Sequence, residues 1–407
     1  MGRNLSDVKD QILKLSSDYR DYTAKLLSDM VKIPSFSGRE KEVCLAIKKM
    51  CEDAGFDEVY IDGLGSVVGR VGKGSRKIAF DAHIDTVEIG DRSQWNKDPF
   101  SGEIDSQYVY GLGTADQSGG AASMIASARI LKELAYDGNF SVYYTFTVME
   151  EDCDGIAWIY LIEKEGLKPD YIVSTEPTAC QLYRGQRGRM EIEILLKGIS
   201  SHGSIPEQGD SAAYKASKVA LAIDKLNREL RPDDDGFLGK GSVTVSHMET
   251  SAPSQCSVPD KAKLYLDRRL TWGEDADLAI SQVKKYIENA VGESAEKVYM
   301  PDYTKRGYKN IDFGQELYFP TWKTDENHEI VTAARKAYHE LYNNELIPGP
   351  CTYSTNAVSF CGRYHIPSII MGPGDVEVCH KPNEFTRIKD LEICAAFYAM
   401  LPFVLEG

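Results

Sequence analysis

The chain has 407 residues, a length that allows two or three domains. Hydrophobic residues make up 42% of it, which is typical of a globular protein rather than of a disordered chain. The formal net charge at pH 7 is −15, and an acidic surface of this size disfavours nucleic acid and anionic membranes as partners. We interpret the charge as serving solubility.

The nine cysteines are odd in number, scattered, and form no CxxC pair. This usage fits a reducing compartment and excludes both a disulfide framework and a thiolate zinc finger. The N-terminus has no apolar signal-peptide core, and no run of 18 apolar residues could span a membrane. We therefore expect a cytoplasmic protein in which any metal ion is held by histidine and carboxylate side chains.

Helices come first along the chain. Apolar residues recur every three to four positions over 5–32 and predict one amphipathic helix, and a second helix is expected at 40–54. Strands follow at 59–61 and 67–71, with glycines between and within them that resemble a dinucleotide-binding turn. We reject that interpretation, because a phosphate cradle needs a helix N-terminus where this sequence continues as a strand.

A short buried strand at 77–80 leads into His83 and Asp85. Residues two positions apart in an extended chain lie on the same face. An imidazole and a carboxylate on one face of a strand end are typical of a metal ligand and the group that orients it. The alternative is a histidine in a turn that is capped by a nearby aspartate. Further ligand-type residues at other strand ends would favour the metal site over this alternative.

Carboxylates do follow at the next strand ends. Asp116 lies in a glycine-rich turn before a helix at 121–134, where it could also serve as the helix N-cap. The nearly continuous apolar strand 141–149 is expected to be covered on both faces, and it ends in Glu150 and Glu151. Buried carboxylates in such a place need a cation or a proton.

The same pattern recurs twice more. The strand that begins at Asp170 ends in Glu176, and His380 follows a strand that begins at Ile369. Right-handed crossovers bring successive strand ends to one edge of a sheet, where ligands collect. The sequence therefore predicts a metal site at this edge.

From Arg187 the pattern changes to strict alternation, which indicates antiparallel strands. The order of the expected elements is β-α-β-β-α-β, as in a ferredoxin-like module. These elements are the strand 190–197, the helix 211–230, the strands 242–247 and 262–270, the helix 275–291 and the strand 297–300. Because His380 lies after the module, we expect an inserted domain at 187–302 between two parts of a metal domain, 1–186 and 303–407.

A resemblance to a known family rests on seven residues: His83, Asp85, Asp116, Glu150, Glu151, Glu176 and His380. In this order, over nearly the whole chain, they resemble the M20 metallopeptidase and aminoacylase family of carboxypeptidase, acetylornithine deacetylase and succinyl-diaminopimelate desuccinylase types. Segments 266–269 and 354–356 look most like the subgroup of selenium-metabolism-linked hydrolases. The resemblance implies an α/β fold, with a mixed, mainly parallel sheet sandwiched by helices and an inserted βαββαβ domain for dimerisation and as a lid.

The resemblance also implies two divalent metal ions per chain. Asp116 would bridge them, His83 and Glu176 would complete one site, and Glu151 and His380 the other. One histidine with several carboxylates suits Zn²⁺, and Mn²⁺ or Co²⁺ would be tolerated. A water shared by two such ions has its pKa lowered to about 7.

Three catalytic roles follow from the resemblance. Glu150 would be the general base, a role worth roughly 10²–10⁴-fold in rate, although spacing alone does not say which glutamate binds metal. Asp85 would orient His83 from behind. His202 would reach the active site of the partner subunit and polarise the scissile carbonyl, which implies a homodimer formed through 187–302.

Substrate contacts are expected from a strand of the inserted domain and from loops of the metal domain. Arg268 or Arg269 would bind a substrate carboxylate, and alternation allows only one of them to face the cleft. Cys256 stands where the family usually has Asn, which puts an amide contact to substrate in doubt. Further lining residues are expected at Ser354, Asn356 and Gly374, with ordinary turn residues as the open alternative.

Three functions compete. The first is a metal-dependent hydrolase that cleaves an amide C–N bond in a small peptide or an N-acyl or N-carbamoyl amino acid bearing a carboxylate. The second is a non-catalytic metal-binding homologue that acts as a binding or scaffold protein; the presence of Glu150 argues against it. The third, a nucleotide-dependent oxidoreductase, is weakened by the missing helix after the glycine-rich turn.

Overall fold

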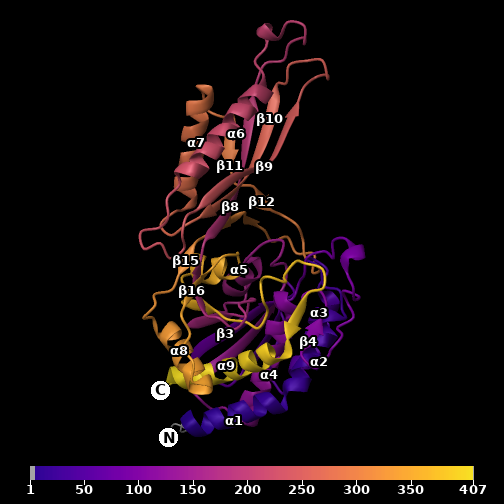
Figure 1. Ribbon diagram of the computed structural model, residues 1–407, viewed down its shortest axis with the longest axis vertical. Coiled ribbons are helices and arrows are strands. Elements are labelled where there is room, and N and C mark those ends of the chain that lie inside the picture. The colour runs from indigo at the N-terminus through magenta and orange to yellow at the C-terminus, as the bar shows by residue number, and fades with distance from the viewer. Residues whose placement is uncertain (1–4, 407) are drawn as a thin grey trace.

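The computed structural model describes residues 5–406 of the chain. Figure 1 shows a broad layered body and a narrower module that projects from one end of it. The N- and C-termini both lie on the broad body, at the end opposite the module. Among the described residues, no helix is both long and apolar enough to cross a membrane.

The broad body is built on a nine-stranded mixed sheet. In spatial order its strands are β1 (Glu58–Ile61), β2 (Val67–Val71), β5 (Phe140–Thr147), β3 (Arg76–His83), β6 (Tyr171–Ser174), β17 (Ser368–Ile370), β7 (Tyr183–Gln186) and β15 (Trp322–Lys323), with β16 (Gly349–Cys351) also on β7. The central pairs β5–β3, β3–β6 and β6–β17 are parallel, and the outer pairs β1–β2, β2–β5 and β7–β15 are antiparallel. The predicted mixed sheet with a parallel centre is thereby confirmed.

Helices cover both faces of this sheet because its central strands are apolar on both sides. Ile78 and Phe80 of β3 pack into the larger core, whereas Ala79 between them packs into a second core on the other face. The larger core is formed with α1 (Leu5–Asp18), α2 (Arg20–Val31), α3 (Lys41–Asp53), α4 (Gly119–Glu133), α8 (Glu329–Tyr342) and α9 (Ile388–Glu406), and the smaller one with α5 (Ile156–Glu163). The single helix expected over 5–32 is wrong, because the chain breaks at Tyr19 into α1 and α2.

The projecting module is a separate antiparallel sheet. Its spatial order is β11 (Lys297–Tyr299), β8 (Gly188–Lys197), β10 (Lys261–Leu270) and β9 (Ser242–Ser251), crossed by α6 (Ala212–Glu229) and α7 (Ala276–Val291). Met190 and Ile192 on β8 alternate with charged residues, so their side chains pack under the two helices while the other face stays open. The β-α-β-β-α-β chain order is the one predicted.

The chain crosses between the two sheets at two adjacent places. Only Arg187 separates β7 of the large sheet from β8 of the small one. On the return, β14 (Tyr318–Phe319) pairs with β8, and β15 pairs with β7. The two crossings therefore run side by side as one antiparallel ribbon. Before it, β12 (Asp302–Tyr303) and β13 (Gln315–Glu316) pair with each other, and on the broad body β4 (Tyr108–Tyr110) pairs with β18 (Phe385–Arg387).

The parallel strands at the centre end at one edge in register. His83 at the end of β3 lies opposite Thr147 of β5, and Asp81 lies opposite Ser174 of β6. The segments that leave these strands therefore start from neighbouring points on the same edge. This is where parallel sheets place their ligands.

Candidate metal centre

Asp116 lies between two histidines that come from distant parts of the chain. Its Oδ1 is 2.9 Å from Nε2 of His83, and its Oδ2 is 3.2 Å from Nε2 of His380. The same nitrogen of His380 is 3.1 Å from Oε1 of Glu151. One carboxylate thus presents a separate oxygen to each histidine. His83, Asp116 and Glu151 can also bring one ligand atom each within 4.8 Å of one another.

The orientation of His83 is fixed by a backbone carbonyl. Its Nδ1 donates to the carbonyl oxygen of Asp85 at 3.0 Å, whereas the Asp85 carboxylate is 3.6 Å away. A carbonyl can only accept, so the proton lies on Nδ1 and Nε2 faces Asp116. Asp85 was expected to orient this imidazole with its side chain, and the structure corrects that expectation: the residue is right, but the group that holds the ring is its main chain.

The Asp85 carboxylate instead holds the turn that follows β5. It accepts the backbone N–H groups of Glu150 and Glu151, each at 3.0 Å, and the hydroxyl of Ser37 at 2.6 Å. A fully buried carboxylate is stable only if such donors replace its water. Asp85 thereby fixes both glutamates relative to β3 and His83.

Two glutamate oxygens in the centre have no hydrogen-bond partner among residues 5–406. They are Oε1 of Glu150 and Oε1 of Glu176, both buried. The other oxygen of Glu150 lies 3.9 Å from Nε2 of His83. Buried carboxylate oxygens without a donor, beside imidazole nitrogens, form a donor set that suits divalent cations. The residues present therefore fit a metal ion.

The electrostatics agree with this interpretation. Burial and neighbouring carboxylates raise the pKa of Glu150 and of Glu176 well above the usual range. Burial alone would lower the pKa of His83, but the Glu150, Asp116 and Glu176 carboxylates outweigh it and raise that pKa. Hydrogen bonds to Asp116 and Glu151 raise the pKa of His380 to about 10. Without a cation, this centre holds protons that a cation would replace.

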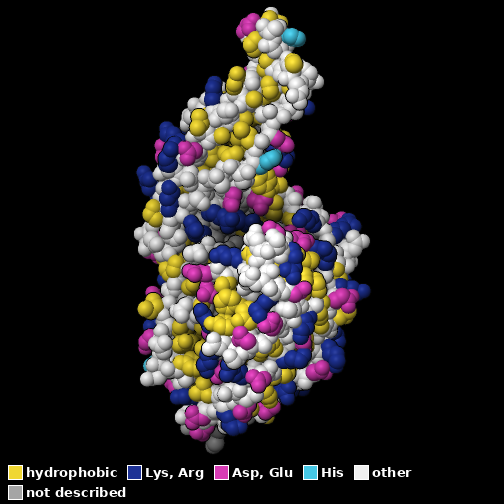
Figure 2. Space-filling view, turned by 45° about the vertical axis from the view of Figure 1, so that its right-hand side comes forward, with side chains coloured by type: hydrophobic (Ala, Val, Ile, Leu, Met, Phe, Trp, Pro, Cys, Tyr) yellow, Lys and Arg dark blue, Asp and Glu magenta, His cyan; other side chains and the backbone are white. Residues whose placement is uncertain are grey.

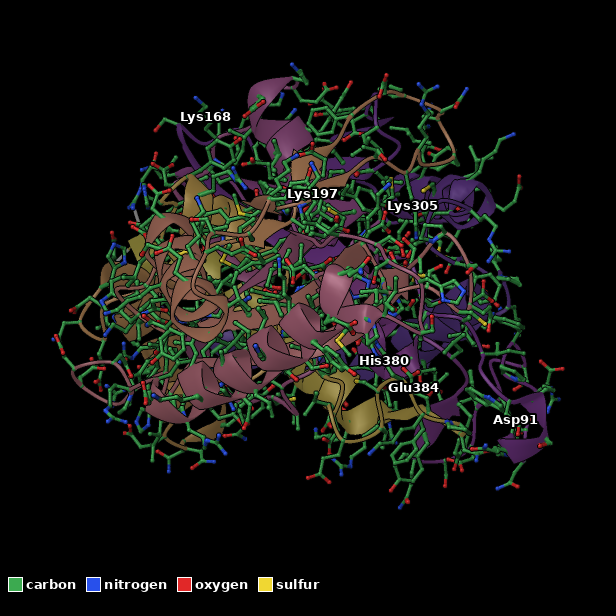
Figure 3. The ribbon with its side chains drawn as sticks, turned by 90° about the horizontal axis from the view of Figure 1, so that it is seen from above. Asp91, Lys168, Lys197, Lys305, His380 and Glu384 are labelled. Atoms are coloured by element: carbon green, nitrogen blue, oxygen red, sulfur yellow. The ribbon has the colours of Figure 1, made fainter. Side chains whose placement is uncertain are left out.

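The sequence did not indicate three buried acidic residues that support the centre. Glu384 accepts the N–H groups of Gly113, Ala115 and Asp116 at 2.7 to 3.1 Å and so holds the loop of Asp116. Glu40 accepts the N–H of Met149, just before Glu150. The third, Asp81, accepts hydrogen bonds from Thr145 at 2.7 Å and from Asn356 at 3.0 Å. Glu384 and Glu40 meet backbone donors of remote segments and Asp81 meets side-chain donors of remote segments, which sequence spacing does not show. Figure 3 shows Glu384 near His380, and their separation by four residues was the one available signal.

Asn356 occupies a different environment from the substrate-lining one that we expected. Its side chain is fully buried, donates to Asp81 and to Thr147 at 3.0 Å each, and accepts the N–H of Gly155 at 2.8 Å. All of this amide is engaged inside the protein. Asn356 therefore links β3, β5 and the end of the turn after Glu150, and it has no group left for a substrate.

The other two lining residues differ from each other. Ser354 is half-buried and accepts a long, 3.5 Å contact from Gln186. Gly374 is buried, and a Cβ there would lie 2.2 Å from the carbonyl oxygen of Ala115, next to Asp116. Close backbone packing thus requires glycine at this position. Ser354 stays a prediction as a substrate contact, and the packing at Gly374 favours the turn-residue alternative.

The two adjacent arginines point to opposite faces of the small sheet. Arg268 is fully buried on the helix side, where it contacts Glu274 at 2.6 Å and Gln282 of α7 at 3.3 Å. Arg269 lies on the open face and is paired with Asp267 at 2.9 and 3.0 Å. Alternation thus leaves Arg269 as the one available to a ligand. Figure 2 shows lysine and arginine side chains gathered where the module meets the broad body.

The structure does not bring His202 to the centre of its own chain. His202 is exposed, and its Nδ1 is 2.7 Å from the hydroxyl of Ser204. Its loop bridges to Ser257, beyond the ends of β8 and β9, at the tip of the module in Figure 1. A cavity of about 760 Å³ lies there, lined by His202, Cys256 and Lys215 among others. The expected role of His202 across a subunit boundary stays a prediction.

Comparisons with known proteins agree with this geometry. Residues 79–402 match the family model "Peptidase family M20/M25/M40". The chain is 44% identical over 391 residues to the uncharacterized protein YgeY of Escherichia coli (strain K12), and the match covers 96% of each chain. It is 28% identical over 386 residues to succinyl-diaminopimelate desuccinylase of Cereibacter sphaeroides (strain ATCC 17025 / ATH 2.4.3), and that match covers 92% of this chain and 96% of the relative. The crystal structure of Bacillus subtilis YXEP protein is described as a dinuclear metal binding peptidase from the M20 family. It superposes with a TM-score of 0.71 at 17% identity, and the superposition covers 96% of this chain and 99% of that one.

The buried carboxylates predict how the stability of metal-free protein depends on pH. The folded state holds protons on Glu150 and Glu176 that the unfolded chain releases near pH 4.3, so the free energy of unfolding falls as the pH rises from about 5 to about 8. Thermal unfolding of chelator-treated protein checks this. A Glu176→Gln variant should lose less over the same range, and a melting temperature that rises towards pH 8 would contradict the interpretation.

Proposed function

The chain belongs to the M20/M25/M40 peptidase family, and we propose that it is a dinuclear metallohydrolase that cleaves an amide C–N bond. The substrate class is a small peptide or an N-acyl or N-carbamoyl amino acid. The relatives support this range: one is named a succinyl-diaminopimelate desuccinylase, and two solved members are described as a metallo-carboxypeptidase and a dinuclear metal binding peptidase. A carboxylate on the substrate would pair with Arg269, which lies on the open face of the small sheet.

One observation carries the proposal: Asp116 offers each of its oxygens to a different histidine. A carboxylate that bridges two cations has this arrangement. We assign His83 and Glu176 to one cation and Glu151 and His380 to the other. Glu176 follows two residues after the end of β6, the neighbour of β3, and its unpartnered oxygen supports its place in this set. Zn²⁺ suits these donors, and Mn²⁺ and Co²⁺ are tolerated.

When bound, the two cations would acidify a water molecule and polarise the scissile carbonyl. In this proposal the remaining steps belong to the protein. Glu150 takes the proton of the attacking water and delivers it to the leaving nitrogen. Its buried Oε1 has no other described partner, and its backbone is fixed by Asp85, so this oxygen is free to hold the proton in one position. Glu151, one residue on, already contacts His380, which supports its assignment as the ligand.

Replacing the general base tests the function against a scaffold role. Glu150→Gln keeps the shape of the side chain but removes its basicity, so turnover should fall by about 10²–10⁴-fold while two metal ions per chain remain bound. Glu42→Gln, on the exposed face of α3, is the matched control and should be unchanged. The assay is a panel of dipeptides and N-acetyl, N-succinyl and N-carbamoyl amino acids, with chelator-treated protein as the metal-free reference.

The outcomes separate the two functions. Full turnover by Glu150→Gln with metal still bound would rule out this residue as the base. If the wild-type protein binds two metals but hydrolyses no member of the panel, the alternative of a non-catalytic metal-binding protein is favoured. Absence of metal binding would contradict both.

We further propose that residues 187–302 form a separate domain and that it forms a homodimer. Large apolar side chains lie on its surface: Leu221 is 71% exposed and Tyr214 74% exposed on α6, and Met248 of the edge strand β9 is 47% exposed. Such side chains gathered on one module are typical of an interface. The same contact would carry the tip of the module, with His202, towards the other subunit.

Mixed dimers test whether His202 acts in the other subunit. His202→Ala alone should lower kcat by about 10²–10³-fold, as expected for a group that stabilises the developing oxyanion. Mixing it with Glu150→Gln subunits should restore about a quarter of wild-type activity, since half of the dimers then hold one site with both residues. If His202 acts within its own subunit, the mixture stays inactive.

A further inference from the structure

The turn that carries Glu150 and Glu151 is held by several segments of the protein. From the broad body, Glu40 and Asp85 accept its first N–H groups, and Asn356 accepts the N–H of Gly155 at its end. From the connector, Gln315 donates to the carbonyl of Asp154 at 3.0 Å. The projecting module contributes one contact with a charged side chain.

That contact is an ion pair between Arg189 and Asp154. Nη2 of Arg189 lies 3.2 Å from Oδ1 of Asp154, and the two side chains are only 21% and 8% exposed. The guanidinium also contacts Glu191 at 3.4 Å and lies 4.5 Å from the ring centre of Phe319. An ion pair this far removed from solvent is weakly screened, and removing one partner leaves an uncompensated charge.

The pair is placed at the junction of the two sheets. Arg189 is the second residue of β8 and lies two positions after Arg187, where the chain leaves the large sheet. Asp154 lies four residues after Glu150 in the same turn. The pair therefore connects the first strand of the module directly to the segment that carries the general base and a metal ligand.

We propose that Arg189 is a positioning residue: by pairing with Asp154, it ties the placement of the Glu150–Glu151 turn to the placement of the projecting module. This inference rests on the proposed function. Asp154 is a buried carboxylate close to Glu150, and its second oxygen has no hydrogen-bond partner among residues 5–406. Arg189 is the cation that the structure gives it. The same short turn also carries Glu150, Glu151 and Asp152, and of these Asp152 is paired with a lysine, Lys305 at 2.9 Å. Without Arg189, Asp154 would repel its acidic neighbours, and the turn would move to separate them.

A second arginine at the same junction supplies the matched control. Arg184 of β7 lies 3.9 Å from the ring centre of Phe237, is paired with Glu326 at 3.8 Å, and is 11% exposed. It therefore also stacks on an aromatic ring at the junction, but its ion pair is with an exposed glutamate that follows β15 of its own sheet. It has no contact with the Glu150 turn among the bonds of the described residues. A purely structural role of junction arginines would affect both positions alike.

The experiment compares Arg189→Met with Arg184→Met in metal-loaded protein. Arg189→Met should lower kcat about tenfold or more with KM changed less than about twofold, because a shift of about 1 Å in catalytic groups costs that much in rate. Arg184→Met should leave both constants within about twofold. Arg189→Lys, which keeps the charge, should recover part of the loss.

Coupling through Asp154 is tested by the double variant. If Arg189 acts through Asp154, Arg189→Met should add little to the loss caused by Asp154→Asn. Losses that multiply in the double variant overturn the proposal. Equal losses of kcat in Arg189→Met and Arg184→Met also overturn it, as does a fall in melting temperature without any change in kcat per folded molecule.

A spectroscopic readout keeps the proposal independent of turnover. Protein loaded with Co²⁺ absorbs visible light according to the geometry of its ligands, and Glu151 is one of the assigned ligands. Arg189→Met should shift this spectrum, and Arg184→Met should not. If wild-type protein hydrolyses nothing in the panel, the proposed function fails while this shift still supports the positioning role. An unchanged spectrum together with unchanged kcat overturns the positioning role alone.

Discussion

The constraint on which the rest of the structure depends is the burial of several carboxylates at one edge of a sheet. Glu150 and Glu176 are buried there, and Asp116, whose side chain is 13% exposed, lies between two imidazoles. Ionised groups in such surroundings repel one another strongly. A cation or bound protons relieve this repulsion, and the surrounding framework fixes where the groups lie.

That framework consists mainly of buried acceptors that bind backbone N–H groups. Asp85 fixes the start of the Glu150 turn, Glu384 fixes the loop of Asp116, and Asn356 links the end of the turn to β3. Each contact joins segments that are far apart in sequence. The centre is therefore a product of the whole broad body. Burying these additional polar groups costs free energy, but their hydrogen bonds fix the positions of the segments that carry the charged residues of the centre.

The projecting module extends this framework in two directions. At its base, Arg189 contacts the turn that carries Glu150 and Glu151, and Arg269 lies on the open face of the small sheet. At its far tip, the loop of His202 is presented away from its own centre. The base of the module thus contacts the site of its own chain, and in the proposed dimer its tip would reach the site of the other chain. The short ribbon at Arg187 joins the module to the broad body and so sets the position of both ends.

The sequence by itself determined the fold class and the order of the module's elements, and it indicated acidic and histidine residues that the structure brings together, because alternation and strand-end chemistry are local patterns. The sequence did not indicate the break between α1 and α2 at Tyr19, because the spacing of apolar residues continues unchanged across it. Only the tertiary structure decided what the side chains around the centre do. Asn356 supports β3 instead of lining a pocket, His83 is held by the Asp85 carbonyl, and Arg268 is buried while Arg269 is not. These outcomes depend on which remote donor or helix each side chain meets, and spacing along one chain carries no information about that.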